Sequence, residues 1–109
     1  MNETQRLEEL QQYRILDSLP EKEFDDIVKM TSGLFETPVS MISLVDSNRS
    51  WFKAKVGVDF YETSRMDSFC RHTLENPDKV MVVCDAIQDE RFTDNPMVKE
   101  GQRVRFYAG

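Results

Sequence analysis

The sequence predicts a small α+β domain, because helical and extended patterns alternate along a chain of 109 residues. The clearest helical pattern covers residues 18–35, where apolar side chains recur three and four positions apart. Two extended patterns, 39–45 and 51–56, follow directly and are separated by turn-forming residues. A helix, a hairpin and several shorter elements together predict an antiparallel sheet covered by helices.

A short amphipathic helix is expected over residues 3–16, ahead of the main domain. Asn2 and Gln5 have the spacing of a capping box, and the apolar stripe of the helix is narrow. A narrow stripe is typical of a helix that leans on a domain surface or on another chain. We therefore expect residues 1–17 to be a helical arm and residues 18–109 to be the domain.

The second helix is expected to begin near Ser18 and to end before Pro38. Ser18 and Glu21 repeat the capping-box spacing, and Pro20 suits a first helical turn, where its missing N–H would have no partner. Acidic residues and Lys29 occupy one face of this helix. The apolar face consists of Phe24, Ile27, Val28, Thr31, Leu34 and Phe35.

Two strands should form a hairpin after this helix. Residues 39–45 are apolar on both alternating faces, which is typical of a strand covered on both sides. Residues 46–49 are turn formers, and in residues 51–56 apolar side chains alternate with Lys53 and Lys55. We expect the second strand to be the more exposed one, with these lysines protecting its edge.

The remaining elements are expected to be short. A polar loop over residues 57–67 precedes a helix that ends near Glu75, and a buried strand is expected over residues 80–84. A helical turn near Arg91 and a strand that begins at Arg103 complete the chain.

The charge distribution excludes several classes of partner. The net charge of −6 comes entirely from residues 1–48, which hold ten acidic and four basic side chains. Nucleic acid is not an expected partner, because no basic run is present to neutralise phosphates. We also expect no membrane span and no signal peptide, a cytoplasmic location, and two reduced cysteines, Cys70 and Cys84.

Several short segments, taken together in their order and spacing, resemble one known family. The segments are Tyr13–Asp17, Pro20–Glu21, Phe24–Asp25, Ile42–Asp46, Trp51–Lys53, Arg65, Ser68–Cys70, His72, Asp85–Ala86, Asp89, Arg91–Phe92, Asn95–Pro96, Val98 and Arg105–Gly109. This set resembles a GAF domain, in the subgroup found at the N-terminus of bacterial sensor proteins. The resemblance covers nearly the whole chain.

The resemblance implies a three-layer α/β/α architecture with a central antiparallel sheet and a ligand pocket on one face. It also implies that the family's last strand and closing helix, which follow the segment ending at Gly109, are lacking here. Strand 39–45 would then lack one neighbour, and its unpaired backbone groups would favour a compensating contact. A homodimer through the N-terminal helix, the exposed sheet edge or both is the expected partner state.

The function implied by the resemblance is a regulatory or sensory module in signal transduction without catalysis of its own. Candidate ligand-binding residues are Arg65, Ser68, His72, Asp85 and Arg91, because arginines and carboxylates beside a half-apolar cavity can orient a small polar metabolite. The sequence identifies no ligand or cofactor, and it predicts neither a metal site nor a catalytic residue. A pure dimerisation module and a cysteine-dependent enzyme resembling the free methionine sulfoxide reductases stay open as alternatives.

The same residues also have ordinary structural interpretations. Cys70 and His72, two positions apart, would point about 200° apart on a helix and could not share one metal. Cys84 is expected to pack in a buried strand, and thiol chemistry would need it as a resolving partner. Local ion pairs and capping account for Asp85 and Arg91 without any ligand.

Overall fold

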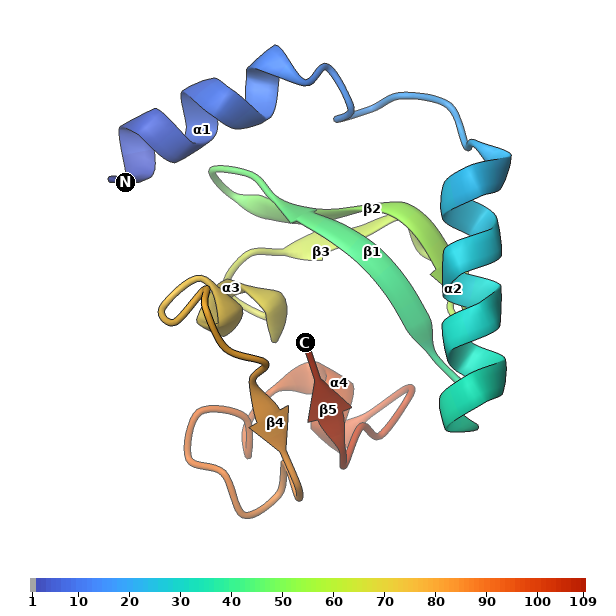
Figure 1. Ribbon diagram of the computed structural model, residues 1–109. Coiled ribbons are helices and arrows are strands. Elements are labelled where there is room, and N and C mark those ends of the chain that lie inside the picture. The colour runs from blue at the N-terminus through green and yellow to red at the C-terminus, as the bar shows by residue number, and fades with distance from the viewer. Residues whose placement is uncertain (1) are drawn as a thin grey trace.

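The computed structural model describes residues 2–109, which form small antiparallel sheets and several helices (Figure 1). This is the α+β class that the sequence predicts. In chain order the elements are α1 (Glu3–Gln12), α2 (Lys22–Phe35), β1 (Ser40–Val45), β2 (Arg49–Val56), β3 (Glu62–Ser64), α3 (Cys70–Thr73), β4 (Val82–Val83), α4 (Pro96–Lys99) and β5 (Tyr107–Ala108).

The main sheet has the strand order β1-β2-β3, and both pairs are antiparallel. Helix α2 packs against β1 and β2, while α3 contacts β1 and lies away from α2 (Figure 1). Strands β4 and β5 form a separate antiparallel pair on the α3 side. The sheet is thus the middle layer, between α2 and the C-terminal third of the chain.

Local capping signals predict the start of α1 but not that of α2. Gln5 N donates to Asn2 Oδ1 at 2.8 Å, and Asn2 N donates to Gln5 Oε1 at 3.1 Å, which is the predicted capping box. The expected start of α2 at Ser18 is wrong, because the Ser18 hydroxyl donates to the Ile15 carbonyl instead. Helix α2 begins at Lys22, and its N-cap residue makes no side-chain capping bond.

The β1–β2 register contains a bulge that changes the environment of one lysine. Ile42 faces Ala54 and Ser43 faces Phe52, so Lys53 is an extra residue in β2. A bulge redirects the side chain that it carries. Lys53 is only 4% exposed, so the expectation that it protects a strand edge is wrong.

The buried side chains form two groups. The first group belongs to α2 and the main sheet, with Val28 on α2, Val45 at the end of β1, and Trp51, Phe52 and Ala54 on β2. The second group joins α3, β4 and α4, where the Phe69 and Phe92 rings stack with their centroids 4.2 Å apart. This second group, called the C-terminal cluster below, consists of Phe69, Val83, Ala86, Phe92 and Val98.

Several short elements differ from expectation. The buried strand expected over residues 80–84 is shorter, since β4 is Val82–Val83 and Cys84 is exposed. Strand β4 pairs only with β5 among the described strands, so alternate side chains remain in contact with water. Strand β3 lies within the expected loop 57–67, and α4 follows the expected turn near Arg91.

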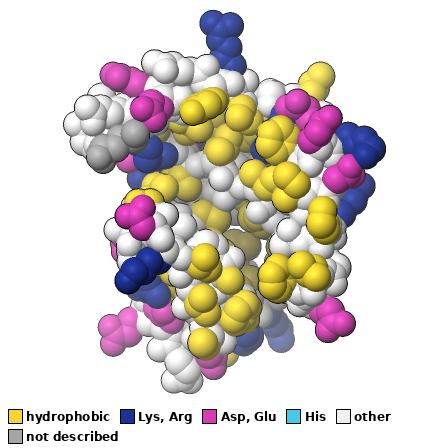
Figure 2. Space-filling model, in the orientation of Figure 1, with side chains coloured by type: hydrophobic (Ala, Val, Ile, Leu, Met, Phe, Trp, Pro, Cys, Tyr) yellow, Lys and Arg dark blue, Asp and Glu magenta, His cyan; other side chains and the backbone are white. Residues whose placement is uncertain are grey.

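One edge of β1 and one face of α2 have no described partner. No strand within residues 2–109 pairs with the edge of β1 opposite β2. On α2, the side chains of Met30, Leu34 and Phe35 are exposed. Figure 2 shows hydrophobic side chains gathered around a hollow between α2, the main sheet and the C-terminal segment. In the described part of the chain, no helix is long and apolar enough to span a bilayer.

Candidate functional site

A cavity of about 630 Å³ lies where β2, α2 and the α1–α2 linker (residues 13–21) meet. The linker contributes Asp17 and Ser18, and α2 contributes Asp25. The buried ring of Trp51 and the exposed ring of Tyr61 come from β2 and the segment that follows it. Its volume is within the range that small-molecule sites occupy, and the cavity is widely open to solvent.

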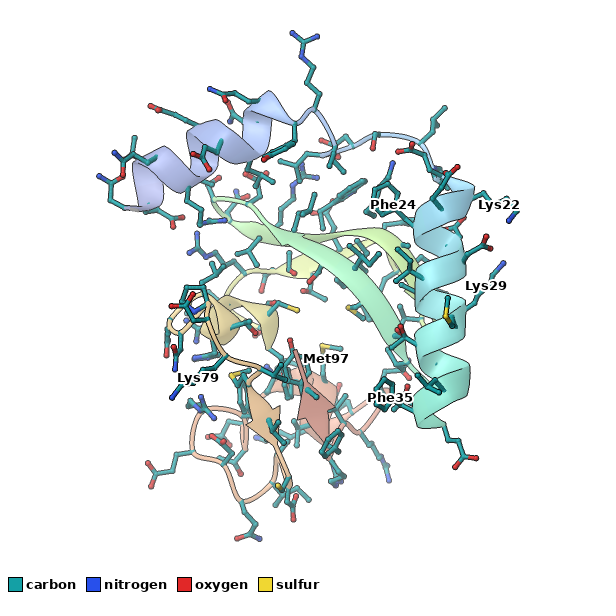
Figure 3. The ribbon with its side chains drawn as sticks, in the orientation of Figure 1. Lys22, Phe24, Lys29, Phe35, Lys79 and Met97 are labelled. Atoms are coloured by element: carbon teal, nitrogen blue, oxygen red, sulfur yellow. The ribbon has the colours of Figure 1, made fainter. Side chains whose placement is uncertain are left out.

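Lys53 binds the linker to the sheet beside this cavity. Its side chain is 1% exposed, and its Nζ donates to Ser18 Oγ at 2.7 Å and to the Leu19 carbonyl at 2.6 Å. The same atom lies 2.7 Å from Glu21 Oε2. Its fourth neighbour is the Phe24 ring, which points from α2 toward the sheet (Figure 3), 5.5 Å away. A buried ammonium is tolerated because oxygen atoms surround it.

Arg49 binds the linker at a second residue, Asp17. Its two Nη atoms each donate to one Asp17 oxygen at 2.8 Å, and its Nε donates to Asp46 Oδ2 at 3.0 Å. The hydrogen bonds with Arg49 lower the pKa of Asp17 below its ordinary value. The bidentate geometry fixes the direction of the linker as well as its distance from β2.

Polar contacts also hold the arm helix α1 against the turn between β1 and β2. Arg65 Nη1 donates to Glu3 Oε1 at 2.6 Å and to the Asp46 carbonyl at 3.1 Å. Arg6 donates to both Glu3 oxygens, at 2.9 and 3.0 Å, and to the Val45 carbonyl. Helix α1 has no buried residue among those described. Its docking therefore depends on polar contacts, of which Glu3 supplies one to Arg65 and Arg6 supplies another to the Val45 carbonyl.

We expect acid to release α1 from the domain. Hydrogen bonds from Arg6 and Arg65 lower the pKa of Glu3 from 4.5 to about 2. Arg6 lies on α1 itself, so only the Arg65 part of this pKa shift favours docking; that part is complete above pH 4.5 and is lost as the pH falls toward about 2. The amide chemical shifts of α1, followed by NMR during an acid titration, would measure the release.

Two variants of α1 sharpen this pH test. Glu3→Gln should loosen α1 already at neutral pH, because the ion pair with Arg65 is lost while Arg6 still donates to the Val45 carbonyl. Glu8→Gln is the matched control, since Glu8 is exposed on the same helix and makes no ion pair in the described chain. An acid transition of α1 that persists unchanged in Glu3→Gln would contradict this role of the carboxylate.

The structure brings two of the predicted ligand-binding residues together at one aromatic ring. The His72 ring stands edge-on to Phe92 with centroids 5.0 Å apart, and the Arg91 guanidinium lies 5.0 Å from the same ring. Arg91 also pairs with Asp89 at 2.8 Å, and His72 Nδ1 lies 3.2 Å from Glu75 Oε1. Both side chains thus have local partners next to the C-terminal cluster.

The other three predicted residues each make a separate polar contact. Arg65 binds Glu3 of the arm, Ser68 Oγ accepts a bond from Cys70 N at 3.0 Å, and Asp85 Oδ1 accepts one from Ile87 N at 3.1 Å. None of the five predicted residues lines the cavity beside Lys53. A ligand-binding role for them stays a prediction.

The two cysteines are free and differ in environment. Cys70 Sγ lies 3.0 Å from Ser43 Oγ and 3.4 Å from the Tyr107 hydroxyl, both of which act as donors. Burial and the neighbouring Cys70 raise the pKa of Tyr107 above its ordinary value. Cys84 is exposed at the end of β4. Residues 2–109 contain no group of three or more His, Cys, Asp or Glu side chains able to hold a metal ion.

We expect the two thiols to react with a disulfide reagent in two separate phases. Cys84 should react first, because its exposed thiol is open to the reagent, whereas neighbours on β1 and β5 enclose that of Cys70. Release of the reagent's chromophore should therefore lose its fast phase in Cys84→Ser and keep it in Cys70→Ser. A single phase of equal rate for both thiols would contradict this assignment.

Sequence reasoning missed the cavity because its walls have no local signature. The linker has no periodic pattern, and Lys53 has the alternation of an exposed strand residue. The one available signal was an aromatic and basic β2 next to an acidic linker, which favours ion pairs but does not indicate a hollow.

The comparisons with known proteins give one informative match. No family model matches the chain. A protein from Pseudomonas aeruginosa named cyclic di-GMP phosphodiesterase is 40% identical over 98 residues. The match covers 90% of this chain but only 16% of the length of that protein. The chain is therefore similar to one domain-sized part of a much longer signalling protein.

Proposed function

We propose that the chain is a cytoplasmic, regulatory GAF-type module of a bacterial signalling protein, which binds a small molecule and performs no catalysis itself. The match to a cyclic di-GMP phosphodiesterase carries this proposal. It spans 90% of the chain and leaves 84% of the relative, enough for a separate catalytic part. The two free cysteines suit a reducing compartment.

The position of the cavity supports a route for the signal. A molecule in the cavity touches β2 and the linker at once, next to the contacts that Arg49 and Lys53 make. Occupancy that favours one position of the linker would shift the position of α1 by the difference in affinity for the two states. In this proposal α1 passes the change to the attached output segment.

The proposal is tested on the purified chain by two measurements. Native mass spectrometry should show a retained small molecule, or binding of one added from a metabolite library. A cyclic di-GMP hydrolysis assay should show no turnover above buffer. Hydrolysis that co-purifies with the chain would overturn the non-catalytic assignment. Alanine substitutions at the five predicted residues and at Asp25 then report which site holds the molecule.

Dimerisation is a second candidate function, favoured by the unpaired edge of β1 and the exposed apolar face of α2. Two chains that pair along these surfaces would satisfy backbone groups and remove apolar area from water. Light scattering should report a dimer. A dimer that persists when residues 1–16 are removed assigns the contact to the edge or α2, and its loss assigns the contact to the arm. A monomer at every concentration would exclude this candidate.

A further inference from the structure

Two of the three lysines that line the cavity already have partners inside the protein. Lys53 is surrounded by linker oxygens, as described above. Lys55 Nζ donates to the Val58 carbonyl at 2.9 Å and lies 4.8 Å from the centre of the Tyr61 ring. Lys29 extends from α2 away from the sheet (Figure 3). An anionic ligand would therefore have to displace existing contacts to reach Lys53 or Lys55.

Two carboxylates of the cavity, those of Asp25 and Glu62, have few or no ion-pair partners among the described residues. Asp25 lines the cavity and forms no ion pair with any residue that the structure describes. Glu62 also lines it, is half-exposed, and contacts Arg49 only at 3.4 Å. Both oxygens of Asp25 and one of Glu62 are thus available to a positively charged group.

Aromatic rings provide the rest of the cation-binding chemistry. The faces of Trp and Tyr rings attract cations, and the Tyr61 ring already accepts the Lys55 ammonium. Trp51 and Tyr61 both line the cavity. The net charge of −6 also raises the local concentration of cations around the domain.

We propose that this cavity binds a small organic cation with an apolar body, such as an aromatic or quaternary amine. The apolar body contacts the rings of Trp51 and Tyr61, and the positive charge lies next to Asp25 and Glu62. The inference rests on the proposed function, because it names the ligand class of the cavity through which the linker is controlled.

The intrinsic fluorescence of the protein reports on this cavity alone, since Trp51 is the single tryptophan. The chain is titrated at constant ionic strength with benzyltrimethylammonium, with the anion 3-phenylpropionate and with neutral benzyl alcohol. We expect a saturable change with the cation and none with the other two. Equal responses to all three probes, or a response to the anion alone, would overturn the cation assignment.

Adjacent aspartates on α2 provide a matched pair of variants. Asp25→Asn should weaken binding of the cation about fivefold, the size expected for a partly exposed charge contact. Asp26→Asn removes the same charge one position away, where Asp26 pairs with Lys22 outside the cavity, and should leave the affinity unchanged. Equal losses in the two variants would indicate general charge attraction and would overturn the site.

A third variant protects the test against a folding defect. Glu62→Gln changes a carboxylate on β3, far in sequence from α2. It should also weaken binding of the cation by about twofold to fivefold. Far-UV circular dichroism confirms that each variant is folded before titration. The cation could bind saturably without changing the activity of an attached phosphodiesterase. That result would contradict the proposed function but leave the cation site supported. Binding of the anion alone would overturn the cation site and leave the proposed function standing.

Discussion

Phe92→Ala is expected to destabilise the protein by about 4 kcal/mol, within the range for truncating a buried aromatic ring. Phe92 is 1% exposed and stacks on Phe69 at 4.2 Å, with the two planes 4° apart. His72 and Arg91 contact the same ring at 5.0 Å each. Removal of the ring leaves a cavity at the centre of the C-terminal cluster and takes away the surface on which both side chains pack.

Urea denaturation followed by circular dichroism measures this loss. A typical domain is stable by about 5–15 kcal/mol, so the loss in Phe92→Ala is a large share of the total and should lower the urea midpoint strongly. The matched control is Phe106→Ala, because Phe106 is 56% exposed and its removal should cost under about 1 kcal/mol. Similar losses for the two variants would show that the C-terminal cluster is not the main source of stability in this half of the chain.

The sequence predicts those elements whose determinants are local. The capping box of α1 requires only Asn2 and Gln5, and both of its hydrogen bonds are present. Helix α2 and the β1–β2 hairpin follow from apolar periodicity, which each segment carries by itself. Their existence was therefore predictable, although α1 ends at Gln12 and α2 begins at Lys22.

Features that depend on distant partners were not predictable. The bulge at Lys53 arises from the pairing of β1 with β2, and the partners that allow its burial are in the linker. Cys84 was expected to be buried because the preceding residues are apolar, but β4 has only β5 beside it among the described strands. Such outcomes are set by tertiary contacts, which a pattern within one segment does not contain.

The candidate site also has parts that the sequence predicted and parts that depend on tertiary contacts. The resemblance supplied the five predicted residues, and the structure brings His72 and Arg91 together while Arg65 binds the arm. The cavity beside Lys53 requires the linker to fold back over β2. The acidic linker and basic β2 favour ion pairs, but composition does not say which residues pair or where the linker crosses β2.

Lys53→Met is expected to destabilise the protein by about 2 kcal/mol and to release the linker. The methionine retains most of the buried aliphatic chain, so the change removes mainly the ammonium group and its three oxygen contacts. The Leu19 carbonyl and Ser18 hydroxyl lose a donor, while the Glu21 side chain, which is 54% exposed, returns to water. The loss should therefore be smaller than the roughly 3–5 kcal/mol seen when a fully buried charge loses its partner.

Limited trypsin digestion separates release of the linker from general unfolding. In Lys53→Met, cleavage after Lys22, the tryptic site next to residues 18–21, should become faster at denaturant concentrations where the C-terminal cluster is still folded. Lys55→Met is the matched control, because Lys55 is also on β2 but donates only to the Val58 carbonyl. Its linker should be cleaved at the wild-type rate.

The comparison of these two lysine variants also tests how the arm is coupled to the sheet. Arg49 still binds Asp17 when Lys53 is removed, so the linker is expected to loosen between residues 18 and 21 and to stay attached at residue 17. Hydrogen exchange of α1 should then rise only modestly in Lys53→Met and strongly when Arg49→Ala is added. Equal exchange of α1 in the single and double variants would mean that the direct contacts of Glu3 and Arg6 position the arm, and that the linker does not transmit the state of the cavity.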